Sequence, residues 1–251
     1  MVRVIKWVVI INSEESMKNR HYSPHNKMAD LVSDHYSILL LIYRFDIPLG
    51  VGERTIKEIC DEYGVDVETF LFVVHFVLFG EGAGQKGMYK KLSMPLIIRF
   101  LRNSHSYFLD FRLPEIRRSM MEAIEKAPED IRFVIQKYFD NYEKEVNQHM
   151  KYEDEVVFPY VESLLEGAKD PEYSIGTFEK RHDQVELKML ELKNIFIKYY
   201  PMEMDFKVNN VLHELFTCSD ELHIHNDVED QILIPCVREM ESDSLNGGIQ
   251  I

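Results

Sequence analysis

Two stretches of the sequence share one pattern: HMKYEDEVVFP at residues 149–159 and HNDVEDQILIP at residues 225–235. Each has a histidine, a glutamate four residues later, and an apolar residue followed by proline at the same offsets. Residues four apart lie on the same face of an α-helix, one turn from each other. The pattern therefore predicts two helices that each present a histidine beside a glutamate.

The sequence around both stretches has the period of a helix. From Ser93 onward, apolar residues recur at intervals of three and four over four long segments. Glycine and proline interrupt these segments at Ala127-Pro128, at Gly167–Pro171 and at Tyr200-Pro201. Amphipathic helices joined by short connections pack beside their neighbours in sequence. We therefore expect an all-α fold, an up-down-up-down four-helix bundle.

Two further histidines fall at the level of the repeated motifs. In an antiparallel helical hairpin, residues equally far from the turn lie at the same height. His105 and His149 are nearly equidistant from the first interruption, and His182 and His225 are nearly equidistant from the last. The two hairpins are related by an offset of 76 or 77 residues, which indicates a repeated unit. We expect all four histidines in one layer of the bundle.

The ionisable side chains of this layer need a partner. Glu153 lies on an apolar stripe with Val146 and Val156, and the second motif repeats this arrangement, so the polar pairs face the core. Burying such groups is costly unless something satisfies them. Imidazoles and carboxylates suit first-row metals, and a carboxylate from each half can bridge two cations. We predict a dinuclear metal site with the ligands His105, His149, Glu153, His182, His225 and Glu229.

The other histidines and one further glutamate carry weaker signals. Glu186 follows His182 by four residues, but the repeat-related residue is Leu109, so we expect Glu186 at the rim of the site. Five further histidines lie off the buried face or show no ligand spacing. We expect these on the surface: His21, His25, His35, His213 and His223.

The composition limits the partners and the compartment. A formal charge of −14 and a pI near 5.2 argue against electrostatic binding to nucleic acid or to an anionic membrane. Cys60, Cys218 and Cys236 form no CxxC pair, which argues against a disulfide framework and a thiolate zinc site and favours a reducing, cytoplasmic compartment. We expect the cysteines, together with Tyr142 and Tyr160, to pack in the core.

We divide the chain into five parts by composition and pattern. Residues 1–27 form a leader whose short apolar run is neither a signal peptide nor a membrane span. Residues 28–80 form a small helical domain, and residues 81–92, which include most of GEGAGQKG, form a linker. Residues 93–242 form the bundle, and residues 243–251 form a tail.

The order of these motifs resembles that of the hemerythrin-like di-iron proteins for repair of iron centres, also described as regulators of cell morphogenesis and nitric oxide signalling. The six predicted ligands match the family's ligand set, and the resemblance implies that Glu153 and Glu229 bridge two iron ions, joined also by an oxo bridge. Oxygen-carrying hemerythrins differ by a fifth histidine. The family's small leading domain often carries adjacent cysteines followed by glycine, where this chain has Pro48, Leu49 and Gly50.

The resemblance implies protection or repair of iron–sulfur clusters after nitrosative or oxidative damage, with iron donation as one route. The partners would be proteins with damaged clusters, and nitric oxide or dioxygen would be the small ligands. One alternative is an oxygen or nitric oxide sensor, in which TIKEICDEYGVDVETFL could form a helix-turn-helix, although the acidic charge weighs against DNA. Another is a di-iron oxidase or nitric oxide reductase. The sequence leaves open manganese or zinc as the metal, and a homodimer.

Overall fold

The computed structural model describes residues 21–82, 87–168, 172–178, 183–199 and 205–246. These residues are mostly helical, with a single isolated β-bridge between Lys27 and Thr55 in the described part, so the predicted all-α fold is confirmed. Two compact units are present. Of the described residues, one unit comprises 21–82 with 91–96, and the other comprises 87–90 and those described from 97 to 246. None of the described helices has the length and apolar character needed to span a membrane.

The described part of the first unit contains four α-helices: α2 (Met28–Asp34), α3 (Ile38–Arg44), α4 (Ile56–Glu62) and α5 (Val67–Phe79). Its apolar side chains form a core of their own, in which Phe45 and Phe70 meet edge to face with ring centroids 5.3 Å apart. Cys60 is buried on α4, as expected for a residue of the helix core.

Local signals in the sequence set the ends of α4 and α5. Thr55 and Glu58 form a capping box: each side chain accepts a hydrogen bond from the backbone N–H of the other residue. Gly80 ends α5 with a left-handed backbone, at φ 68°. Gly82 also needs to be glycine, because a Cβ there would lie 2.6 Å from the Phe72 ring. Gly80 therefore ends α5, and Gly82 lets the chain pass close to Phe72.

The bundle unit contains four long helices, each of which combines α-helical segments with a π-helical segment labelled η. The first long helix consists of α6 (Met94–Ser106), η2 (Tyr107–Arg112) and α7 (Leu113–Ala123). The second consists of α8 (Glu129–Tyr152), η3 (Glu153–Val157) and α9 (Phe158–Leu165). The third consists of α10 (Asp183–Asn194) and η6 (Ile195–Tyr199). The fourth consists of α11 (Phe206–Val228), η7 (Glu229–Leu233) and α12 (Ile234–Asn246).

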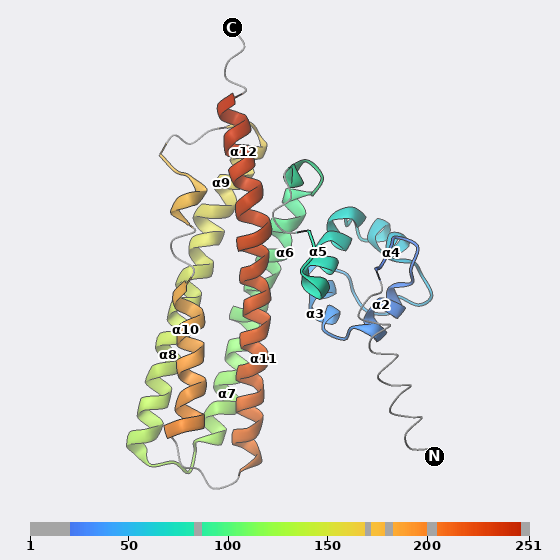
Figure 1. Ribbon diagram of the computed structural model, residues 1–251. Coiled ribbons are helices and arrows are strands. Elements are labelled where there is room, and N and C mark those ends of the chain that lie inside the picture. The colour runs from blue at the N-terminus through green and yellow to red at the C-terminus, as the bar shows by residue number, and fades with distance from the viewer. Residues whose placement is uncertain (1–20, 83–86, 169–171, 179–182, 200–204, 247–251) are drawn as a thin grey trace, which may run out of the picture. The chain divides into compact units, whose positions relative to one another are not determined.

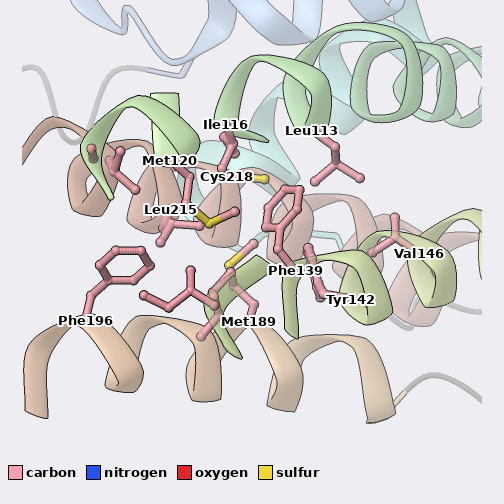
Figure 2. Packing of buried hydrophobic residues seen from close by; sticks show 14 of the residues in the cluster. Leu113, Ile116, Met120, Phe139, Tyr142, Val146, Met189, Phe196, Leu215 and Cys218 are labelled. Carbon is pink, nitrogen blue, oxygen red and sulfur yellow. The ribbon is translucent and has the colours of Figure 1, made fainter. Parts of the chain in front are cut away.

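The helices close into a ring in the order of the chain. Contacts join α7 to α8, α8 to α10, α10 to α11 and α11 back to α7, and these four run side by side in Figure 1. This is the predicted up-down-up-down bundle. Side chains from all four helices meet in one apolar core (Figure 2), including Phe139, Met189 and Leu215. Tyr142 and Cys218 are buried in this core, as predicted.

Candidate metal centre

Four of the six predicted ligands meet in one buried layer beside this apolar core. His105 lies near the end of α6 and His225 near the end of α11, while Glu153 begins η3 and Glu229 begins η7. Each offers one nitrogen or oxygen atom to a group whose atoms all lie within 4.8 Å of one another. His105 is 2 % exposed and the other three are 0 % exposed. The fold thus brings residues far apart in the sequence to one point.

The donor atoms face each other across the layer. His105 Nε2 lies 2.9 Å from Glu153 Oε2, and His225 Nε2 lies 3.3 Å from Glu229 Oε1. The two imidazole rings meet at an angle of 67°, with centroids 5.1 Å apart. The two halves of the repeat therefore share a single cluster.

His149 stands at the edge of the layer and contacts the same glutamate from the other side. Its Nε2 lies 2.8 Å from Glu153 Oε1, and its side chain is 11 % exposed. The ring stacks against Phe178 at a centroid distance of 6.2 Å. His182, the sixth predicted ligand, lies outside the described residues, and so does the side chain of Glu186.

Sequence reasoning missed one carboxylate at the site. Asp154 Oδ1 lies 3.1 Å from His105 Nδ1, the ring nitrogen that faces away from the cluster. Arg102 approaches the same oxygen at 3.9 Å and forms a closer pair with Glu162, at 2.9 Å. The sequence signal was present, because Glu-Asp occurs in both repeated motifs, but three acidic residues in a row do not reveal which of them reach the histidines.

The pKa values of the two buried histidines, His105 and His225, are shifted in opposite directions. Burial by itself lowers the pKa of His105, but hydrogen bonding to Asp154 and Glu153 outweighs it and raises the pKa to about 9. Burial lowers the pKa of His225, and the nearby Glu229 carboxylate only partly offsets this effect. In this layer, His105 therefore binds a proton more readily than an ordinary histidine, and His225 binds one less readily.

Aromatic rings wall the layer, and here one detail of the sequence prediction is wrong. Phe158 stacks against His105 with ring centroids 5.5 Å apart, and Phe108 meets His225 edge to face at 6.0 Å. We expected Val156 on the buried stripe, but Val156 is partly exposed while Val157 and Phe158 are 0 % exposed. The cause is the π-helical turn η3, which contains one more residue per turn than an α-helix.

Four of the five histidines expected on the surface are largely accessible: His21, His25, His213 and His223. The expectation is wrong for His35, which is partly buried between Tyr22 and Phe79 in the first unit. It was missed because a histidine between polar neighbours gives no signal of an aromatic contact made by a distant residue.

The cysteines are not part of the described cluster. All three are free and buried, and the described cluster contains no sulfur atom. Burial raises the pKa of Cys218 to about 12 and that of Cys236 to about 12, so both stay protonated at neutral pH. Their core role is confirmed, and Tyr160 is buried as predicted.

The donor set fits a metal cation. First-row metals bind imidazole nitrogen and carboxylate oxygen at about 2.0–2.2 Å, so donors on one ion lie about 3–4 Å apart. The cluster has this spacing, with nitrogen–oxygen distances of 2.8 to 3.3 Å. An all-nitrogen and oxygen set suits iron, manganese or zinc better than a metal that prefers sulfur.

Comparison with known proteins supports the same interpretation. A family model described as the Hemerythrin HHE cation binding domain matches residues 96–237, which is more than half of the chain. All six predicted ligands lie within the match. No curated protein matches the chain.

Proposed function

We propose that this chain, which belongs to the hemerythrin family of HHE cation-binding domains, holds two iron ions in the buried layer and serves to protect or repair iron–sulfur clusters. The damage would come from nitric oxide or from oxidants, and the chain would give up iron to rebuild a cluster. A cytoplasmic location agrees with its free cysteines. Its partners would be proteins with damaged clusters, and its charge of −14 argues against nucleic acid.

One observation carries the proposal of a metal pair. The two oxygens of Glu153 face histidines on different helices, Oε2 toward His105 at 2.9 Å and Oε1 toward His149 at 2.8 Å. A carboxylate placed between two imidazoles in this way is suited to bridge two cations, one on each side. Glu229, at the repeat-related position, is equally buried and faces His225.

The chemistry of the donors favours release as well as binding. Imidazole and carboxylate hold iron less firmly than thiolates hold it in a cluster. When bound, iron in such a shell supplies a redox-active Lewis acid with open positions for nitric oxide or dioxygen. The chain itself supplies orientation and exclusion of water: Asp154 faces the outer nitrogen of His105, and Phe158 covers that ring.

The first test is metal analysis of anaerobically purified protein together with an optical spectrum. We expect two iron ions per chain after expression in iron-rich medium, because the repeated motif supplies two half-sites. A content near zero or one would contradict the proposal. Manganese or zinc in place of iron would keep the site and change the assigned metal.

The second test concerns function. Iron-loaded protein is mixed with an apo iron–sulfur protein, sulfide and a reductant, and the return of the cluster is followed by its absorbance. We expect the cluster to return while this protein loses iron in step. Repeated consumption of nitric oxide or dioxygen with a reductant would instead identify an enzyme. Reversible gas binding without iron loss would identify a sensor.

The third test is the assignment of the bridging residues. We expect Glu153→Ala and Glu229→Ala each to lose more iron than Glu186→Ala, because a bridging carboxylate contacts both ions and we expect Glu186 to contact neither. Glu162→Ala, on the same helix as Glu153 but paired with Arg102 at the surface, is a matched control. An empty site in Glu186→Ala and a full site in Glu229→Ala would overturn the assignment.

A further inference from the structure

The π-helical turns of the bundle share a position relative to proline. Each ends two residues before a proline: η2 before Pro114, η3 before Pro159 and η7 before Pro235. The π-helical segment η6 is likewise followed in the sequence by Tyr200-Pro201, beyond the described part of that helix. A feature that recurs in this way in all four helices calls for a common cause.

Proline provides the cause. It lacks an N–H group, and its ring clashes with the carbonyl four residues earlier, so an α-helix cannot continue unchanged through it. In η2, η3 and η7, the residue before the proline donates its N–H to the carbonyl five residues back. Phe158 donates to Glu153, and Ile234 donates to Glu229. The turn that proline imposes therefore closes on the backbone of the buried glutamate itself.

The first bundle helix shows the same turn without a ligand at its start. Leu113, before Pro114, donates to the carbonyl of Phe108, again five residues back. Phe108 offers no donor atom to a metal, and His105 lies before the turn. In this helix the π-turn therefore forms before a proline although no predicted ligand begins the turn.

The prolines do not act through the core. Pro159 is exposed and Pro235 is only partly buried, so neither side chain belongs to the buried layer. The carbonyls that would have bonded to them belong to Glu155 and Gln231, which are exposed residues. A proline inside a helix ordinarily destabilises it. Its presence here, at matching positions in both repeats, needs a reason other than stability.

The turn changes what faces the layer. An α-helix would place Val156 and Val157 on the face of Glu153 and turn Phe158 away, whereas η3 brings Phe158 inward beside Val157 and leaves Val156 partly exposed. Phe158 then lies against the His105 ring while Glu153 lies between His105 and His149. The geometry of the carboxylate and that of its apolar cover are therefore set by one backbone feature.

We propose that Pro159 and Pro235 are positioning residues for the metal pair: they impose the π-turns that hold the carboxylates of Glu153 and Glu229 at the centre of the layer. The inference rests on the proposed function, since it takes these glutamates as metal ligands. Removal of either proline lets the helix return to α-helical hydrogen bonding, and the glutamate side chain then rotates away from its histidine partners.

The experiment uses full-length Pro159→Ala and Pro235→Ala, with Pro114→Ala as the matched control. Thermal unfolding of the metal-free proteins reports on the helices, and the rate of iron loss to a chelator reports on the site. Co²⁺, read from its absorption bands, serves as a second probe of the ligand geometry. Amide exchange at position 159 in Pro159→Ala shows directly whether the new N–H is hydrogen-bonded.

We expect all three metal-free variants to unfold at or above the wild-type temperature. We also expect Pro159→Ala and Pro235→Ala to release iron about tenfold faster or more, the size of effect typical of residues that orient ligands. Pro114→Ala should release iron within about twofold of the wild type, because its turn carries no ligand. The Co²⁺ bands should shift only in the first two variants, and the new amide at position 159 should be protected from exchange.

Three outcomes would overturn the inference. Wild-type release rates and Co²⁺ bands in Pro159→Ala and Pro235→Ala would show that the prolines do not position the ligands, while the proposed function would stand. Faster release accompanied by a lower unfolding temperature would show that their role is only structural. A wild-type chain that binds neither iron nor Co²⁺ would remove both the proposed function and this inference.

Discussion

His105 has a carboxylate on each side of its ring, and the two contacts assign different tasks to its nitrogens. Nδ1 faces Asp154 at 3.1 Å, and Nε2 faces Glu153 at 2.9 Å within the cluster. A histidine that donates one ring N–H to a carboxylate presents the other nitrogen, unprotonated, to a metal. Asp154 therefore lies where a carboxylate can orient the His105 ring for metal binding.

Loss of the Asp154 charge should weaken metal binding without emptying the core. We expect Asp154→Asn to lower metal affinity by about 10- to 100-fold, because the ring of His105 loses its charged partner. Competition against a chelator of known affinity measures this. Glu155→Gln makes the same change of charge on the exposed neighbour and should stay near the wild type. Equal effects of the two substitutions would show that only the overall charge matters.

Metal affinity should rise with pH across the range that His105 titrates. In the metal-free protein the pKa of His105 is raised to about 9, so this residue must lose a proton when a metal binds at neutral pH. We expect chelator competition to give tighter binding at about pH 9 than at about pH 6.5, the two ends of this titration. A pH-independent affinity would contradict a role for His105 as a ligand.

The stability of the metal-free protein should change in the opposite direction over this range. The folded-state pKa of His105 lies above the unfolded value near 6.5, so its stabilisation is present below about pH 6.5 and is lost as the pH rises through about 9. The pKa of His225 is lowered, so acid below about pH 6.5 favours unfolding through that residue. Denaturant unfolding between about pH 6.5 and 9 measures the first effect, and His105→Asn should reduce it.

The grouping of His105 with Glu153 could be predicted from the sequence because spacing along a helix determines which face a residue occupies. His105 and Glu153 were placed at one level by their distances from a turn, and the structure brings them within 2.9 Å. Asp154 could not be placed in this way. Its contact depends on the rotation of one helix about its axis relative to the next, which no periodicity of a single chain encodes.

At the scale of single elements, the hydrophobic pattern did not predict the π-turns. The predicted stripe assumed an α-helix through residues 149 to 159, and the error appeared at Val156, just inside the turn. The proline that causes the turn was visible in the sequence. Its usual meaning, a kink or an end, did not indicate how the chain would accommodate it. The helix continues by accepting one wider turn, closed on Glu153.

The capping box of α4 allows a test of an element in the first unit. Thr55→Ala removes the side chain that accepts a hydrogen bond from the Glu58 N–H, at a cost of about 1 kcal/mol in helix stability. We expect roughly fivefold faster amide exchange in residues 56–62, which is that cost expressed as a ratio. Glu58→Gln keeps a capping box, since glutamine serves at that position. It should leave exchange near the wild-type rate, and similar rates in both variants would show that the cap contributes little.

At the scale of the whole molecule, the chain separates into a unit that carries the buried layer of histidines and glutamates and a unit that carries none of the described cluster. The bundle could be predicted because four periodic segments with short connections allow few arrangements. The first unit resisted prediction of a role. Its sequence has Pro48, Leu49 and Gly50 where a redox or metal role would call for cysteines, and Leu49 is 68 % exposed.

Removal of the metal should lower the stability of the bundle unit and leave that of the first unit unchanged. Without a cation, the two buried glutamates share a water-poor layer with the histidines, and the chain reduces this cost by protonation, by admitting water or by loosening the helices. Because the metal binds the folded site and has little affinity for the unfolded chain, free metal at about 100 times its dissociation constant adds about 2.7 kcal/mol of stability.

Amide exchange with and without iron locates this effect along the chain. We expect exchange around His149 and His225 to become faster when iron is removed, since the turns next to these residues carry the glutamates. Residues 55–75 of the first unit serve as an internal control, because they include no member of the cluster. Uniform acceleration in both units would indicate global destabilisation. Unchanged protection around both histidines would mean that the layer is an ordinary polar core, held by the contacts of 2.8 to 3.3 Å between its own side chains.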